Sequence, residues 1–286
     1  MDRVAARVDV VVVNYNGGDL LSEAVAAVLA STVPVRLVLV DNASTDGSVE
    51  AAETRFPDVH FLHNSRNLGF AAAANRGMKE GDAEFVLLLN PDCLLQPDTL
   101  EQMLRVLEAH PEAGMAGCRI LNPDGSEQRG CRRTLPSLAS AAGKALGRQQ
   151  AMDLHLQPLP DTPGHVEAIS GAFMLLRRQA IDEVGLLDEG YFMHCEDLDW
   201  CRRFLDAGWK ILFVPHVEVV HHQGHCSRAL PLRVLWHKHR GMARYYRKFL
   251  AGRAGPFRSA VVLPSIYARF LFLAARDGLR RRVAGR

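Results

Sequence analysis

Carboxylates occur at two places in the chain where their surroundings favour chemistry, and the first is Asp92. It follows a run of five apolar residues, Phe85 to Leu89, and the turn Asn90-Pro91. A short apolar run bounded by turn residues is typical of a strand buried on both faces, and proline ends the sheet ladder because it has no N–H to donate. Asp92 is therefore expected at the carboxyl edge of a central strand, where open α/β sheets bind ligands. It can close a turn there, or bind a hard metal ion that holds a phosphorylated substrate.

The second group is Glu196, Asp197 and Asp199, within the segment Tyr191 to Arg203. These acids begin a predicted helix, where the helix dipole alone would favour them. Three acids within four residues, directly after the apolar sequence Tyr-Phe-Met, exceed what this effect requires. One carboxylate against an apolar wall is a candidate general base.

A histidine cluster is the third candidate. His221, His222 and His225 follow a strand predicted over His216 to Val220. Such histidines are either structural or bind a metal ion through an imidazole nitrogen. Because the chain also offers carboxylate ligands, a metal-binding role is as well supported as a structural one.

An alternation of strands and helices must position these groups. Strands are predicted at Val8–Val13, Val35–Val40, Val59–Leu62 and Phe85–Leu89, with helices between them. This order indicates βαβ units and a mostly parallel sheet. Polar residues follow three of these strands: Asn14, Asn16, Asp41, Asn42 and Asp92. Polar loops gathered along one edge of such a sheet predict a nucleotide site. Neither GxGxxG nor GxxxxGK[ST] is present, which argues against a dinucleotide-binding fold and a P-loop.

The middle of the chain is less regular. A helix at Pro97–Ala109 and a strand at Gly114–Leu121 precede an irregular stretch, 122–165, with arginines at 129, 132 and 133. This stretch either folds over a bound substrate or is a variable loop with solvated arginines. Gly171-Ala172, in the regular segment Val166–Arg178, would let a ligand approach the backbone closely.

Composition bounds the class of protein. The chain has 286 residues, 48% hydrophobic and 23% charged, which is enough for one large globular domain with an appendage. Its six cysteines form no CxxC pair, which favours reduced thiols in a cytosolic compartment. We expect no secretory signal, and no apolar run of the roughly 18 residues needed to span a bilayer.

The last sixty residues differ in charge from the rest. From Arg228 onward, fifteen Lys or Arg face a single Asp, whereas the whole chain carries a net charge of +2, so the remainder is acidic. The segments Leu230–Leu250 and Phe257–Ala275 mix basic with apolar residues. This predicts amphipathic helices on an anionic membrane surface, or a helix pair that packs on the catalytic domain or on a second subunit. No nucleic-acid motif accompanies the charge.

Seven stretches together resemble the family-2 inverting glycosyltransferases of the GT-A fold, and in particular their bacterial rhamnosyltransferase-like branch. The resemblance runs from about Val8 to Ser227 and agrees in order and spacing. The stretches are VVVNYNG, VDNASTDGS, NSRNLGFAAAANRG, LLLNPD, SGAFMLLRR, DEGYFMHCEDLDWCRR and HHQGHCS. It implies a GT-A catalytic domain over residues 1–227 and a basic, amphipathic helical tail over residues 228–286.

The resemblance also implies the donor site. Residues lining the nucleotide and its phosphates would be Asn14, Tyr15, Asp41, Arg66, Asn67, Asn75 and Asn90. Asn90-Pro91-Asp92 resembles the family's DxD element with its first acid replaced by Asn90, so Asp92 would bind Mg²⁺ or Mn²⁺. His222 is the expected second metal ligand, because Gly224 and Ser227 follow at the family's offsets, and His221 is the alternative.

By the same resemblance, Asp197 is the general base, and Glu196 and Asp199 support the base and the acceptor. Gly171, Ala172 and Trp200 are assigned to acceptor binding. The implied reaction moves a sugar, best L-rhamnose from dTDP-rhamnose, to a saccharide or lipid-linked glycan at the inner face of the cell membrane. A UDP-sugar donor and a non-catalytic protein that binds nucleotide or glycan are the alternatives.

Overall fold

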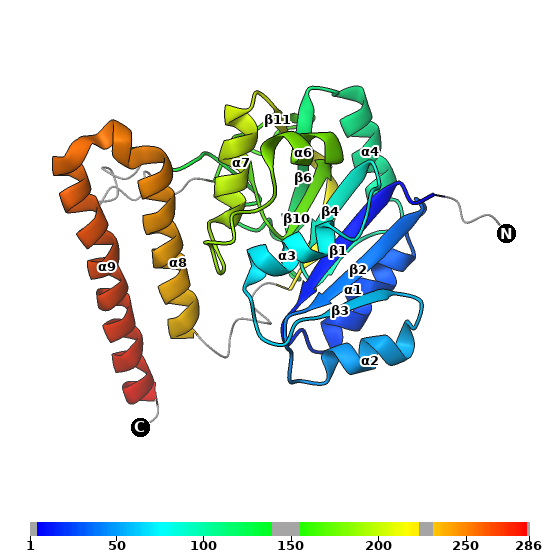
Figure 1. The fold of residues 1–286 in the computed structure, drawn as a ribbon, viewed down its shortest axis with the longest axis horizontal. Coiled ribbons are helices and arrows are strands. Elements are labelled where there is room, and N and C mark those ends of the chain that lie inside the picture. Colours follow the sequence, from blue (N-terminus) through cyan, green and yellow to red (C-terminus); the bar gives the residue numbers. More distant parts are fainter. Residues whose placement is uncertain (1–4, 139–154, 223–230, 285–286) are drawn as a thin grey trace.

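A computed structural model describes residues 5–138, 155–222 and 231–284. A central β-sheet lies between layers of helices, and a pair of long helices stands beside this body (Figure 1). The strands are β1 (Val8–Asn14), β2 (Val35–Asp41), β3 (His60–His63), β4 (Phe85–Leu89), β5 (Cys93–Leu94), β6 (Ala113–Leu121), β7 (Arg132–Arg133), β8 (Gly164–His165), β9 (Ala168–Ile169), β10 (Phe173–Arg177) and β11 (Lys210–His221). The helices are α1 (Asp19–Leu29), α2 (Ser48–Arg55), α3 (Phe70–Met78), α4 (Thr99–Ala109), α6 (Arg178–Val184), α7 (Glu196–Asp206), α8 (Pro231–Tyr245), the π-helical turn η2 (Tyr246–Leu250) and α9 (Ala251–Ala284).

The main sheet has the strand order β3-β2-β1-β4-β10-β6-β11-β5, with β8 paired to β11. Strands β1 to β4 pair in parallel, and so do β6 and β11, whereas β10 runs antiparallel between β4 and β6. The expected mixed α/β architecture with a mostly parallel sheet is therefore confirmed.

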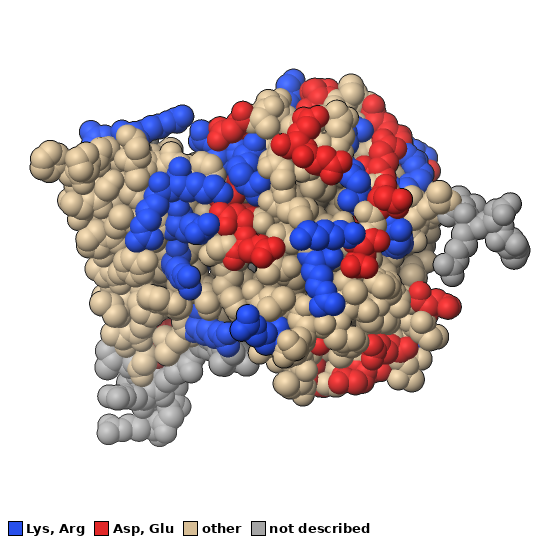
Figure 2. Space-filling model, viewed as in Figure 1, with Lys and Arg blue, Asp and Glu red and all other residues tan. Residues whose placement is uncertain are grey.

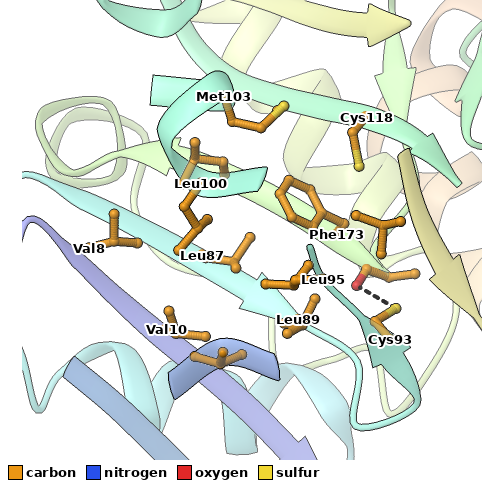
Figure 3. Packing of buried hydrophobic residues seen from close by; sticks show 14 of the residues in the cluster. Val8, Val10, Leu87, Leu89, Cys93, Leu95, Leu100, Met103, Cys118 and Phe173 are labelled. Atoms are coloured by element: carbon orange, nitrogen blue, oxygen red, sulfur yellow. Dashed lines mark hydrogen bonds between the residues drawn. The ribbon is translucent and has the colours of Figure 1, made fainter. Parts of the chain in front are cut away.

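Strand β1 shows why these residues form a central strand. All of its residues are buried, and successive side chains point to opposite faces of the sheet. Val8, Val10 and Val12 join the apolar cluster beneath α1 and α4, whereas Val11 and Val13 join the cluster beneath α3. Figure 3 shows the first of these clusters, with side chains of β1, β4, β10 and α4 packed together. A continuous Val and Leu run is stable only when both faces are covered in this way.

Most predicted elements occur within one or two residues of their expected bounds. One difference lies near the site, because Lys210–Val214 and His216–Val220 form a single strand, β11. Its pairing with β6 shifts register between Val214 and Glu218, which is the signature of a bulge. Pro215 lies within this shift and does not end the strand.

The five cysteines among the described residues are free and buried, as expected of reduced thiols; Cys226 lies outside those residues, as do Gly224, His225 and Ser227. The boundary expected at 227/228 falls within residues 223–230, which are likewise outside the described part of the chain.

The basic C-terminal segment forms two helices, α8 and α9, that run antiparallel as a hairpin (Figure 1). The backbone leaves the helical conformation at Gly255, with φ 77° and ψ 168°, and Pro256 follows. The stretch Leu232–Gly278 contains a window long and apolar enough to cross a membrane by length and composition, and no residue of that window is buried inside the protein. The expectation that no such stretch exists was therefore wrong.

The hairpin is joined to the body by apolar and ionic contacts. Tyr245, Tyr246 and Leu250 are buried in the same apolar cluster as α7. Arg244 and Lys248 both form ion pairs with Asp188, at 2.8 and 2.9 Å. Figure 2 shows Lys and Arg side chains on the hairpin and along its junction with the body, and most acidic side chains on the body.

Candidate active site

The carboxyl ends of the parallel strands lie at one edge of the sheet, as expected. Asn14 at the end of β1 pairs with Asp41 at the end of β2, and the turn after β4 carries Asn90 and Asp92. A cavity of about 830 Å³ opens at this edge, between the body and the hairpin. Predicted site residues that line it are Tyr15, Asn67, Asn90, Asp92, Gly171, Ala172, Glu196 and Asp197.

Asn14 and Asp41 lie beneath the cavity floor. The Asn14 amide donates to the hydroxyls of Ser44 and Ser48, at 3.0 and 3.1 Å, and the Asp41 carboxylate accepts the Ser44 backbone N–H. Both side chains are buried, so in this structure they shape the loop after β2 from below. Their direct contact with a nucleotide stays a prediction, as does that of Arg66, which is exposed outside the cavity lining.

Asn75 makes structural contacts within the body. Its amide donates to the Leu187 carbonyl at 2.9 Å, and its Oδ1 accepts the Leu187 N–H at 3.0 Å. This reciprocal pair ties α3 to the loop that precedes α7. In this structure Asn75 is buried and does not line the cavity, so its contact with a nucleotide stays a prediction, as it does for Asn14 and Asp41.

The residue brought to Asp92 is His221. Its Nε2 lies 3.1 Å from Asp92 Oδ1, and Asp92, Cys93 and His221 form a group of metal-ligating atoms within 4.8 Å of one another. His222 contacts Asp92 through its backbone, whose N–H donates to the Asp92 carbonyl at 2.9 Å. The His221 imidazole and the His222 backbone are therefore what meet Asp92 in this structure. Its geometry favours the alternative ligand, His221, over the preferred one, His222.

The donor set at Asp92 and His221 fits a divalent cation. Gln128 Oε1 accepts the His221 Nδ1–H at 2.9 Å, and the Asn90 amide lies 3.2 Å from Nε2. With Nδ1 held by Gln128, Nε2 is the ring nitrogen that faces Asp92 and could bind a cation. Nε2 and Asp92 Oδ1 lie close enough together to be ligands of the same ion. Cys93 is the poorer ligand, because burial raises the pKa of its thiol well above the usual range.

Asp197 lies at the start of α7 and faces the cavity. The chain enters this helix through His194 and Cys195, which both have positive φ, at 64° and 72°. This conformation is uncommon for residues other than glycine and indicates a tightly constrained turn. The segment before β10 runs past the carboxylate, since a Cβ placed on Gly171 would lie 3.5 Å from Asp197 Cβ.

The Asp197 carboxylate accepts a hydrogen bond from Arg133 of β7, whose guanidinium also donates to the Ile169 carbonyl at 2.8 Å. Burial acts to raise the pKa of Asp197, but the charge and hydrogen bond of Arg133 outweigh it and hold that pKa below its usual value. One of the three arginines in the irregular segment is thus part of the site.

Glu196 is buried beside Asp197, and its Oε2 has no hydrogen-bond partner among the described residues. Burial, followed by the negative charge of Asp197, raises the pKa of Glu196. The pKa values of the two adjacent carboxyls are therefore shifted in opposite directions, upward for Glu196 and downward for Asp197.

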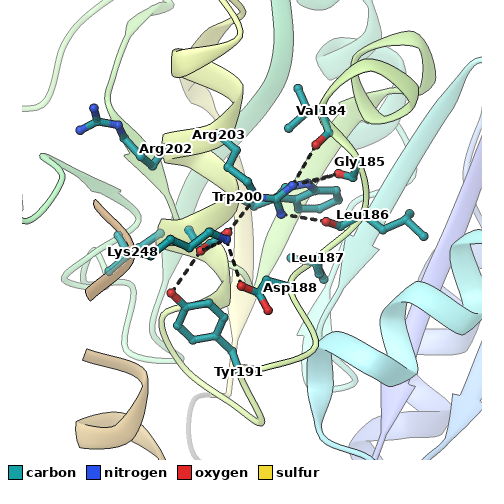
Figure 4. Close-up of polar contacts among 12 residues, drawn as sticks. Val184, Gly185, Leu186, Leu187, Asp188, Tyr191, Trp200, Arg202, Arg203 and Lys248 are labelled. Carbon is teal, nitrogen blue, oxygen red and sulfur yellow. Dashed lines mark hydrogen bonds and ion pairs between the residues drawn. The ribbon is translucent and has the colours of Figure 1, made fainter. Parts of the chain in front are cut away.

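Asp199 and Trp200 lie on the other side of α7, away from the cavity. Asp199 is fully buried and accepts hydrogen bonds from Arg203 at 2.8 Å, Lys248 at 2.7 Å and Tyr191 at 3.1 Å (Figure 4). The Trp200 indole is in the core and donates to the Gly185 carbonyl at 2.8 Å. Residues two apart in a helix point about 200° away from each other, so Asp197 and Asp199 cannot share a site. The structure therefore does not bring Asp199 and Trp200 to the cavity with Asp197, and it gives no support to their predicted catalytic and acceptor-binding roles.

Several residues of the site were missed. Gln128, which orients His221, lies 93 positions before it, and no spacing signals this contact. Asn42 and Ser44 were read only as part of a polar loop. The hairpin was expected on a membrane surface, or packed on the catalytic domain or a second subunit. It does pack on the catalytic domain, but the part of its side chains in the cavity wall was not predicted.

Comparison with known proteins decides the family. The model of "Glycosyl transferase family 2" matches residues 9–185. This range includes strands β1 to β4 and the polar turns at their carboxyl ends. The chain belongs to this family. As a family-2 glycosyltransferase it has the GT-A fold, with the helical hairpin as a C-terminal addition.

Individual relatives narrow the comparison. The enzyme is 35% identical, over 95% of its length and 94% of the relative's, to the N-acetylglucosaminyl-diphospho-decaprenol L-rhamnosyltransferase of Mycobacterium tuberculosis. It is 28% identical to the rhamnosyltransferase WbbL of Escherichia coli, over 62% of this chain and 66% of that one. Among solved structures it resembles a mannosyltransferase of Pyrobaculum calidifontis in complex with GDP-mannose and Mn²⁺. The TM-score is 0.56 at 20% identity, over 99% of this chain and 81% of that one. The chain is therefore a glycosyltransferase.

Proposed function

We propose that this enzyme transfers L-rhamnose from dTDP-rhamnose to a saccharide carried on a lipid diphosphate, with inversion at the anomeric carbon. The observation that carries the proposal is the meeting of Asp92, Ala172 and Asp197 in the lining of one cavity. The mycobacterial relative, which matches almost the whole chain, supports the sugar and the acceptor class.

Asp92 and His221 would hold Mg²⁺ or Mn²⁺ against the donor diphosphate. Carboxylate oxygens suit both ions, and the donor phosphates and water would complete the coordination. A bound cation supplies Lewis-acid stabilisation of the departing nucleoside diphosphate. Gln128 would keep the His221 ring in its ligating tautomer through the hydrogen bond to Nδ1.

Asp197 is the proposed general base. Its carboxylate would take the proton of the acceptor hydroxyl as that oxygen bonds to the anomeric carbon and the bond from this carbon to the diphosphate oxygen breaks. Its lowered pKa keeps it ionised at neutral pH, and Gly171, which would bind the acceptor, lines the same cavity beside it. General-base assistance is typically worth about 10²–10⁴ in rate.

The hairpin would place the enzyme on the inner surface of the membrane. Large apolar side chains of the hairpin that do not line the cavity are exposed, among them Phe257 (88%), Phe272 (67%) and Leu271 (65%). Basic residues surround them, as in helices that lie on an anionic lipid surface. Such a location suits an acceptor anchored in the same membrane.

Two measurements test the proposal. The first is a thermal-shift screen with dTDP, UDP, GDP and ADP, each with Mn²⁺, Mg²⁺ or EDTA, in which we expect dTDP to stabilise only with metal. The second is a transfer assay with dTDP-rhamnose and N-acetylglucosaminyl diphosphate on a short prenyl chain, with the product identified by mass. Stabilisation by UDP instead would point to a UDP-sugar donor. Nucleotide binding without turnover on any acceptor would favour a binding protein.

A further inference from the structure

The cavity wall that the hairpin supplies differs in composition from the wall that the body supplies. The body side carries the polar groups Asn90, Asp92 and Asp197. On the hairpin side, three basic residues lie among apolar ones: Arg233, Val234, Lys238, Met242, Leu250, Val261, Val262, Ile266 and Arg269. This wall is shaped for a ligand that has both a negative charge and an apolar portion.

The basic residues of the wall are not neutralised within the described part of the chain. Arg244 and Lys248, on the other side of the hairpin, form ion pairs with Asp188. Among the described residues, by contrast, Lys238, Arg233 and Arg269 form no ion pair with a carboxylate, and Arg233 lies against the Phe192 ring. Unpaired cations that converge on one cavity repel one another, and an anion bound between them would relieve that repulsion.

The position of Lys238 relates this charge to Asp197. Gly241 packs so closely on the turn before α7 that an added Cβ would lie 2.7 Å from the His194 carbonyl oxygen. The side of α8 that carries Lys238 therefore faces the turn leading to Glu196 and Asp197. Burial, and then the charge of Lys238, lowers the pKa of His194 to about 4, which agrees with this proximity. The positive charge lies at the acceptor end of the cavity, and the donor diphosphate has its own cation site at Asp92 and His221.

We propose that Lys238, Arg233 and Arg269 bind the diphosphate of a prenyl-diphosphate-linked acceptor, and that Val262 and Ile266 contact its first isoprene units. This inference rests on the proposed function and adds where the lipid end of the acceptor binds. The hairpin then has two roles, since its outside lies on the membrane and its inner wall receives the acceptor.

The test is a calorimetric titration with farnesyl diphosphate in EDTA and without donor. EDTA prevents metal-dependent binding of the diphosphate at Asp92, and the readout does not depend on turnover. We expect Lys238→Ala and Arg269→Gln each to weaken binding about tenfold, as expected for a charge-assisted contact. Ile266→Ser should reduce the preference for farnesyl diphosphate over inorganic diphosphate. Arg253→Gln, which removes an exposed hairpin cation outside the cavity, is the matched control and should bind as the wild type does.

Unchanged affinity in both charge variants would overturn the proposal. Equal affinity for inorganic and farnesyl diphosphate would overturn its lipid part. A sedimentation assay with phosphatidylglycerol vesicles distinguishes binding of the acceptor from binding of lipid headgroups. If Lys238→Ala and Arg269→Gln reduce vesicle binding as strongly as Arg253→Gln does, and still bind farnesyl diphosphate normally, these cations bind the membrane and the proposal fails. Failure of the proposed function would be seen separately, as absence of rhamnosyl transfer in an enzyme that still binds farnesyl diphosphate.

Discussion

The two sides of α7 present the same kind of residue to different surroundings. On the side toward the cavity, Asp197 has one charged partner, Arg133, which comes from a short strand in the irregular segment. On the opposite side, Asp199 is enclosed by Arg203, Lys248 and Tyr191. Asp199 is fully buried, and three side-chain donors hold its carboxylate away from the cavity. Asp197 accepts only from Arg133 and the Leu198 backbone N–H among the described residues, and it lines the cavity, so lone pairs of its carboxylate remain for a substrate.

This difference separates the proposed general base from a structural acid within one helical turn. Asp199 joins α7 to the hairpin through Lys248, and Asp188 strengthens that contact. Asp197 contributes to neither contact. Substitutions on the two sides should therefore affect different properties of the enzyme, and four of them test this.

The largest expected effect is on turnover, from Asp197→Asn. The amide cannot accept the acceptor proton, so the rate of transfer should fall by about 10²–10⁴. The thermal shift produced by dTDP with Mn²⁺ should stay as in the wild type, because Asp92 and His221 are unchanged. Normal turnover with weakened donor binding would remove Asp197 from the role of base.

Asp199→Asn should instead reduce stability. It leaves Arg203 and Lys248 without their buried counter-charge, which we expect to cost about 2–3 kcal/mol after allowance for the partial exposure of both cations. Tm should fall by roughly 3–5 °C in a calorimetric scan. Asp206→Asn is the matched control on the same helix, because Asp206 forms an exposed pair with Arg202 and should change Tm little. An equal loss from both variants would contradict the assignment.

Arg133→Gln tests the electrostatics of the cavity side. Arg133 lowers the pKa of Asp197, so its removal should raise that pKa, and the base would become protonated at a higher pH. The midpoint of the acidic limb of the pH–rate profile should shift to higher pH by about one unit. Arg105→Gln, in an exposed pair on α4, should leave the limb where it is. A downward move would mean that Arg133 acts on another group.

The smallest effect should come from Glu196→Gln. The pKa of Glu196 is raised in the folded enzyme, so the folded state binds a proton that the unfolded state releases above its usual pKa. The free energy of unfolding of the wild type should therefore decrease as the pH rises from the pKa of Glu196 in the unfolded chain to its pKa in the folded enzyme. The glutamine variant has no carboxyl to titrate there, so it should lack the decrease that Glu196 causes. We expect the variant to gain about 1 kcal/mol on the wild type between pH 6 and pH 8, measured by urea unfolding. Parallel pH dependences would show that Glu196 ionises normally.

Sequence alone determined the sheet and the position of its ligand edge. Val8–Val13, Val35–Val40 and Phe85–Leu89 are apolar enough that only a strand buried on both faces satisfies them, and the polar turn after each strand must then lie at the same edge. The motifs in those turns were sufficient to predict the family. These properties depend on local pattern, so the sequence contains them.

Tertiary structure decided which member of each pair of neighbouring residues faces the site. His221 rather than His222 meets Asp92 because β11 pairs with β5 in one register after its bulge, and a shift of one residue would exchange the two imidazoles. Asp197 rather than Asp199 faces the cavity because Trp200 and Phe204 turn the helix toward the core. The partners that complete the site, Gln128 for His221 and Lys238 for the far wall, come from distant parts of the chain. Their approach is set by the packing of whole elements, and no local pattern in the sequence encodes it.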